Sequence, residues 1–178
     1  AGGSGKNLFI KMPAGNGFIF GNPKFDWGYH SVKQAQLNNR KIYFARGKGL
    51  GGTSIVNGMV YIRGVAQDYD NWRQMGLDGW GYSDLLPYFK YSEGSTNRQN
   101  KFHGNQGPLK VEPARNFSVL DEAFIKAAVE TGHEFLDDFN ANKRAGVSRI
   151  DSTTYRGVRQ SSAISYLKKI PKKLKIFK

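Results

Sequence analysis

The pattern of apolar and polar positions in the first quarter of the chain predicts a β-hairpin. Strand-like runs lie near residues 28–34 and 41–45, and the turn-prone tetrapeptide at 37–40, Leu-Asn-Asn-Arg, joins them. The preceding residues 1–25 are rich in glycine and are interpreted as loop, with one short apolar stretch at 8–10. We therefore expect a long loop that leads into a short hairpin.

After the glycine-rich segment, apolar residues recur at helical spacing. Tyr69, Trp72 and Met75 stand three positions apart and predict a helix over 67–75, which Gly76 can end. A second short helix is expected at 83–90, with Ser83 as its N-cap and a proline inside it.

The remaining residues mix both kinds of element. Residues 94–107 are polar and predict a loop, and 108–111 predict a short strand. A capping signal, Ser118 with Asp121, begins a helix that ends before Gly132 and carries an apolar stripe. Strand-like residues near 148–155 precede a last helix at 162–169, stopped by Pro171. The stripe consists of Leu120, Phe124, Ala127 and Ala128. The expected class is α/β, as a mixed α+β arrangement, because no clean strand–helix alternation is present.

Composition narrows the class of protein. The 178 residues are 39% apolar and 13% aromatic, which excludes a disordered tail. No apolar run approaches the ~20 residues that span a bilayer, so no transmembrane segment is expected. There is no cysteine, and the histidines, His30, His103 and His133, are not spaced like metal ligands. We expect no metal site, and we favour a cytoplasmic location.

The net charge of +13 is concentrated at the C-terminal end. Six lysines occupy the last eleven residues, so the other 167 carry 13 − 6 = +7. No nucleic-acid motif accompanies them, and we expect no nucleic-acid partner. A solvated basic face is the simplest interpretation. The remaining charge could hold an anionic pyrophosphate, or make the chain a non-catalytic basic module that docks on acidic partners. These lysines are Lys168, Lys169, Lys172, Lys173, Lys175 and Lys178.

Residues 47–64 carry an unusual density of glycine. Six of these eighteen positions are glycine, against an average usage of about 7%. Such density indicates positive φ angles or a backbone that comes close to another group. Apolar residues between the glycines indicate a buried segment rather than a flexible linker.

This segment resembles the first signature of the glucose–methanol–choline (GMC) oxidoreductases. The matching positions are Gly47, Leu50-Gly51-Gly52-Thr53-Ser54, Asn57, Tyr61, Gly64 and Asp70. The resemblance extends over nearly the whole chain. Further matches in the family's order are residues 1–3, 25–29, 79–90, 103–109, 138–140 and 159–167.

The resemblance implies an FAD cofactor held by this loop. Gly51, Gly52 and Thr53 would lie along the pyrophosphate and ribitol, where glycine N–H groups suit phosphate oxygens. Residues 57–60 would lie against the isoalloxazine ring. These residues are Asn57, Gly58, Met59 and Val60.

The implied activity is oxidation of the CH–OH group of a small alcohol, of the choline or alcohol dehydrogenase type, by hydride transfer to flavin N5. Two other activities on the same scaffold stay open, a lyase and a photodecarboxylase. No catalytic residue is expected here, because the family's catalytic histidine lies further C-terminal. His103 is expected in a structural turn.

The resemblance also implies that this chain lacks parts of the complete enzyme. No βαβ unit with a ribose-binding acid precedes the loop, so the chain is expected to be a piece that works with the remaining segments of one enzyme. We assign 1–112, with the flavin loop at 46–64, to the FAD-binding domain, and 113–178 to the start of the substrate domain. Val56 occupies the position at which choline oxidases carry a flavin-linking histidine, so FAD is expected to be non-covalent.

Overall fold

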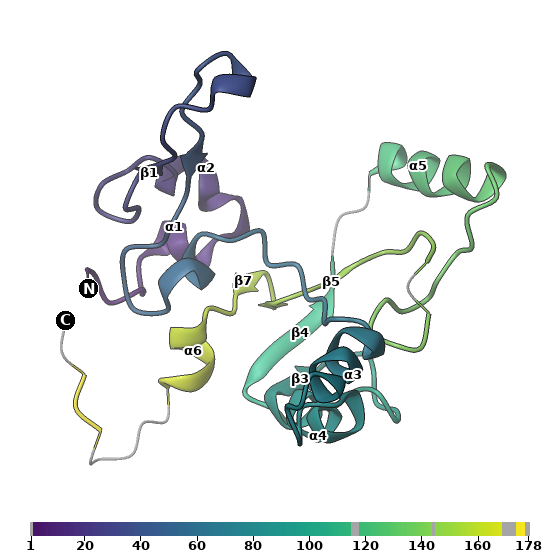
Figure 1. Ribbon diagram of the computed structural model, residues 1–178. Helices are drawn as coiled ribbons and strands as arrows, with labels where there is room; N and C mark the ends of the chain where they lie inside the picture. The colour runs from purple at the N-terminus through teal and green to yellow at the C-terminus, as the bar shows by residue number, and fades with distance from the viewer. Residues whose placement is uncertain (1, 115–117, 144, 169–173, 177–178) are drawn as a thin grey trace. The chain divides into compact units, whose positions relative to one another are not determined.

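The computed structural model describes residues 2–114, 118–143, 145–168 and 174–176, which form two compact units. Unit 1 combines Ala1–Met59 with Thr154–Lys178, and unit 2 is Val60–Thr153 (Figure 1). Four of the six C-terminal lysines lie outside the described residues, as do Ala1 and Pro171, which was predicted to stop the last helix.

Unit 1 is built from short elements around a small apolar core. The core consists of Ile10, Ile19, Phe25, Ile55 and Val56, all less than a tenth exposed. The elements are α1 (Leu8–Lys11), η1 (Pro13–Gly15), α2 (Asn16–Ile19), β1 (Tyr29–His30), η2 (Ala35–Leu37), β2 (Tyr43–Phe44), η3 (Gly52–Ile55), β6 (Thr154–Tyr155), β7 (Val158–Arg159) and α6 (Ser162–Tyr166).

The expected hairpin is confirmed, in a shorter form. β1 pairs with β2 in antiparallel register, and Asn38 and Asn39 at its end both adopt left-handed φ angles, 55° and 57°. Asparagine tolerates this region better than most residues. Buried Asp26 holds the base of the hairpin by accepting hydrogen bonds from the Tyr43 hydroxyl and from backbone N–H groups. Burial raises the pKa of Asp26, but these bonds outweigh it and hold the pKa well below its ordinary value.

The prediction of loop over residues 1–25 was wrong in part. This stretch contains α1 and α2. The Asn7 side chain caps α1 by accepting from the Phe9 N–H at 2.9 Å, and each helix buries one isoleucine, Ile10 or Ile19. Four-residue helices leave no periodic signal, and tertiary burial stabilises them.

Unit 2 carries a three-stranded sheet and three longer helices (Figure 1). The sheet order is β3-β4-β5, with β3 parallel to β4 and β5 antiparallel to it. The elements are α3 (Ala66–Gln74), α4 (Tyr82–Ser92), β3 (Glu93–Ser95), β4 (Leu109–Pro113), α5 (Val119–Glu130) and β5 (Asp151–Ser152). The mixed α/β class is confirmed.

Most expected elements of unit 2 are present. α3, α4 and α5 match the predicted helices, and the Ser118 side chain caps α5 by accepting from the Asp121 N–H. Two details were wrong. Gly81, not Ser83, is the N-cap of α4, because the Asp84 carboxylate accepts the Gly81 N–H. Residues 93–95 form a strand rather than the start of a loop.

The apolar stripe predicted on α5 is exposed to solvent, with Leu120 at 80% and Phe124 at 71%. The predicted domain boundary after residue 112 falls inside β4, and the assignment of the two parts to FAD-binding and substrate domains stays a prediction. None of the helices described is both long and apolar enough to cross a membrane.

Candidate functional site

The glycine-rich loop has the backbone geometry that its composition predicts. Gly51 and Gly52 adopt φ angles of 101° and 55°, which glycine enters without the steric cost that a Cβ brings. They lead into the 3₁₀ turn η3. Met59, at the end of the loop, is a non-glycine residue with φ 61°. Such angles cost about 1–3 kcal/mol and cluster at binding sites.

One face of the loop is packed closely against its own unit. A Cβ on Gly47 would stand 2.2 Å from the Gly52 carbonyl oxygen. The chain near the N-terminus runs alongside, where Gly3 forms a parallel bridge with Gly49. There a Cβ on Gly5 would meet the Leu50 carbonyl oxygen at 2.5 Å. These glycines are required by the fold of unit 1.

The opposite face of the loop is open. A Cβ added to Gly52 or Gly58 would meet no atom within 4 Å. Thr53 is exposed, and neither its N–H nor its hydroxyl has a partner within the described part of the chain. This face therefore offers unpaired donors beside a bare backbone, a chemistry that fits phosphate oxygens. The residues expected to hold FAD thus fit the group.

Neighbouring side chains fix the loop in place. Ile55 and Val56 enter the core of unit 1. The Ser54 hydroxyl donates to the Gly51 carbonyl at 2.6 Å and accepts the Ser162 N–H, at the start of α6, at 2.9 Å. Lys48, which flanks the loop, has a partner within its own unit, because its ammonium group lies over the Trp27 ring.

Arg159, which begins the family match at 159–167 but was assigned no role from the sequence, organises the end of the loop. Its side chain is fully buried on β7. Nη1 donates to the Asn57 carbonyl oxygen at 2.6 Å and to Asn57 Oδ1 at 2.9 Å. Nε donates to the Ile10 carbonyl oxygen, and Nη2 to Asn16 Oδ1. The sequence does not show that Arg159 contacts Asn57, because 102 positions separate the two residues.

The seven predicted cofactor residues fall into two groups. Unit 1 contains Gly51, Gly52, Thr53, Asn57, Gly58 and Met59, all on one continuous loop. Val60 begins unit 2, where its backbone forms an antiparallel bridge with Ser152. Their contact with FAD stays a prediction.

Unit 2 contains a buried network of charged side chains. His103 Nδ1 contacts Glu93 Oε1 at 2.7 Å, and Nε2 contacts Asp138 Oδ2 at 2.8 Å. Arg63 pairs with the other oxygen of Glu93 at 2.7 Å. Burial lowers the pKa of His103, but the two carboxylates outweigh it and raise the pKa to about 9. A histidine already protonated at neutral pH is a poor proton acceptor, which agrees with the structural role expected for it.

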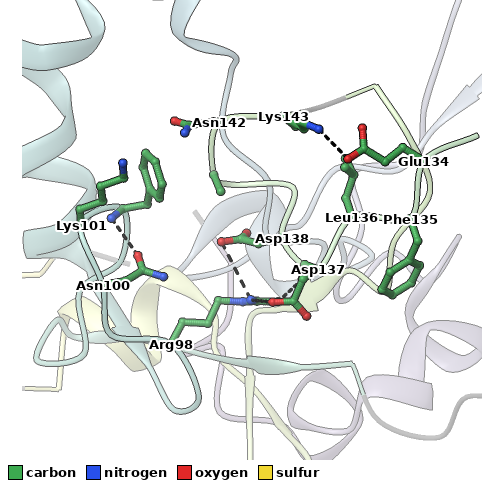
Figure 2. A pocket seen from close by; sticks show the side chains of 12 residues that line it. Arg98, Asn100, Lys101, Glu134, Phe135, Leu136, Asp137, Asp138, Asn142 and Lys143 are labelled. Atoms are coloured by element: carbon green, nitrogen blue, oxygen red, sulfur yellow. Dashed lines mark hydrogen bonds and ion pairs between the residues drawn. The ribbon is translucent and has the colours of Figure 1, made fainter.

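A surface groove of about 610 Å³ lies beside this network (Figure 2). Among the side chains that line it, Arg98 pairs with Asp137, and Lys143 pairs with Glu134 (Figure 2). These four charged groups thus satisfy one another in pairs. Among the residues that the structure describes, no cluster of histidine, aspartate and glutamate could hold a metal ion.

Comparisons with known proteins show what this chain is similar to. The family model described as GMC oxidoreductase matches residues 4–176. An oxygen-dependent choline dehydrogenase of Sinorhizobium fredii is 43% identical over 167 residues, which cover 94% of this chain and 30% of that protein. The corresponding protein of Brucella anthropi is 40% identical over 89% of this chain and 29% of its own length.

Solved structures with a similar fold also match nearly the whole chain. Pyridoxine 4-oxidase from Mesorbium loti superposes with a TM-score of 0.87 at 32% identity, covering 95% of this chain and 33% of that one. An FAD-dependent oxidoreductase from Chaetomium thermophilum gives 0.81 at 29% identity, covering 93% and 30%. The chain thus spans about a third of the length of the relatives it matches.

Proposed function

Since the chain belongs to the GMC oxidoreductase family, we propose that the full-length protein binds FAD and oxidises the CH–OH group of a small alcohol. The observation that carries the proposal is the open face of the loop, where Gly52 and Gly58 leave space and Thr53 offers unpaired donors. When bound, FAD supplies the hydride acceptor of the reaction.

The residues of this chain have binding and positioning roles in the proposal. Gly51, Gly52 and Thr53 lie along the pyrophosphate and ribitol, and the donors are the N–H groups of Gly51 and Thr53 and the Thr53 hydroxyl. The Gly52 N–H already donates to the Gly49 carbonyl oxygen at 3.0 Å. Asn57 and the three following residues lie against the flavin ring. The rigid core behind Ile55 and Val56 keeps these donors fixed, so that binding does not have to order the loop.

The substrate class follows from the relatives. The curated relatives at 42–43% identity are oxygen-dependent choline dehydrogenases, so we propose choline, or a similar small alcohol, as the donor. The charged network of unit 2, which includes Arg63, Glu93 and His103, is paired internally, so we assign it to the stability of the fold rather than to substrate binding. We assign residues 1–112 to the FAD-binding domain and 113–178 to the beginning of the substrate domain.

The test uses the full-length protein. It is purified and its visible spectrum is recorded, and reduction of the flavin by choline is then followed without oxygen. We expect a flavin absorption band that bleaches on adding choline or a related primary alcohol. A protein that purifies without flavin and takes up none would contradict the proposal, and would favour the basic binding module. Flavin that no alcohol bleaches would point to the lyase or the photodecarboxylase.

A further inference from the structure

The buried guanidinium of Arg159 is unusual because only neutral oxygens surround it. Its four hydrogen bonds go to two backbone carbonyls and to the side-chain oxygens of Asn16 and Asn57. No acidic side chain in the described ranges forms an ion pair with it. Burial lowers the pKa of Arg159, yet arginine stays charged in proteins. A buried charge without a counter-ion is costly, and a compensating group is expected nearby.

Arg159 also decides which way the Asn57 amide points. A guanidinium has donors and no acceptor, so only the oxygen of the amide can face it. Asn57 Oδ1 accepts from Arg159 Nη1 at 2.9 Å and from the Met59 N–H at 3.3 Å. The Nδ2 group is left as a donor with no acceptor in the described part of the chain, on a residue that is exposed.

From this geometry we propose that Arg159 is a positioning residue for the cofactor. It holds the Asn57 amide with Nδ2 turned toward an acceptor atom of the flavin ring, and it places a positive charge directly behind that donor. This inference rests on the proposed FAD site and adds a role to it. Both effects stabilise the electron-rich reduced ring more than the oxidised ring, so Arg159 raises the reduction potential of the bound flavin.

The alternative is a purely structural role. Arg159 ties α1, α2 and the loop together, so its loss would lower stability whether or not it acts on the flavin. A reduction potential separates the two roles, because it compares reduced and oxidised forms of the same folded protein.

The experiment measures the midpoint potential and the melting temperature of the full-length flavoprotein. Arg159→Lys keeps the charge but lacks the forked donors, and Asn57→Asp keeps an acceptor for Arg159 while removing the Nδ2 donor. We expect each to bind reduced FAD about tenfold more weakly relative to oxidised FAD, a potential about 30 mV more negative for a two-electron couple. Asn57→Asp should not lower the melting temperature, because the new carboxylate still accepts from Arg159 and adds a counter-ion to it.

Two further variants complete the test. Arg156→Met removes a positive charge from the exposed turn of the same β6–β7 hairpin and should leave the potential unchanged. The double variant Asn57→Ala with Arg159→Lys should shift the potential no further than Asn57→Ala alone, because the two residues act as one unit.

The outcomes are distinct. A wild-type protein without flavin overturns the proposed function and this inference with it. A wild type that holds flavin, with an unchanged potential in Asn57→Asp, overturns this inference alone. That second result is readable even where the Arg159 variants fail to fold.

Discussion

The two units each bury an arginine, and the arginines are treated in opposite ways. Arg63 in unit 2 faces Glu93 at 2.7 Å, inside a network that also contains His103 and Asp138. Arg159 in unit 1 has only neutral oxygens around it. Unit 2 neutralises its buried charge internally, which suits a scaffold. Unit 1 leaves a buried positive charge beside an open loop, which suits a ligand-binding site.

The largest effect is expected from Glu93→Gln in unit 2. Glu93 is fully buried between Arg63 and His103 and also accepts the Gly104 N–H. Removing its charge leaves two buried cations poorly compensated, at a cost of about 3–5 kcal/mol. Chemical denaturation of the full-length protein measures this loss.

A matched control is Glu122→Gln. Glu122 forms a bidentate pair with Arg149, but both side chains are about half exposed. Such a pair contributes about 0–1 kcal/mol. Equal losses in the two variants would refute the view that unit 2 depends on its buried network.

The second effect is a pH dependence of the stability of unit 2. The folded pKa of His103, about 9, is above the ordinary value of 6.5, because Asp138 and Glu93 stabilise the imidazolium. Arg63 and Arg98 are the cations of the same network. The stabilisation is thus fully present below pH 6.5 and is lost as the pH rises to 9, a change of about 3 kcal/mol.

The measurement is urea denaturation of the full-length protein at several pH values across this window. His103→Gln should be less stable at pH 6.5 and should lose most of the slope between pH 6.5 and 9. A wild type whose stability is flat over that range would show that His103 is neutral in the fold.

A third prediction compares two glycines of the loop in unit 1. Gly47→Ala places a methyl group 2.2 Å from the Gly52 carbonyl oxygen and should cost about 1–3 kcal/mol of stability. Gly52→Ala meets open space and should cost about 1–2 kcal/mol, from its positive φ alone. Its main effect should be weaker FAD binding, because the methyl group enters the face proposed for the cofactor.

Fluorescence titration with FAD after removal of the flavin, together with thermal melts, checks this pair. The informative quantity is the loss of affinity relative to the loss of stability. If Gly52→Ala binds FAD as tightly as the wild type, the open face of the loop is not the cofactor site.

The smallest expected effect concerns a covalent bond between the protein and the flavin, because we expect no such bond. Val56 has no nucleophile, and its side chain is buried in the core of unit 1. We predict that acid precipitation of the full-length protein releases the yellow colour into the supernatant. Colour that stays in the washed pellet would show a covalent bond to another residue.

The sequence alone predicts several turns, the longer helices and the family of this protein. Gly51 and Gly52 permit the positive φ angles that the structure contains, and the turn at Asn38-Asn39 and the Ser118 cap are also local signals with local causes. Helices α3, α4 and α5 are long enough to carry a period. The GMC signature is equally local, because one continuous loop carries most of it.

Only the tertiary structure decided the rest. α1 and α2 are too short to leave a pattern, and burial of Ile10 and Ile19 stabilises them. Arg159 meets Asn57 across 102 positions, and Arg63 meets Glu93 across 30. A sequence lists both arginines alike. Whether a buried cation is paired with a carboxylate or left beside an open loop depends on which distant segments fold against it, because charges act through distance in space.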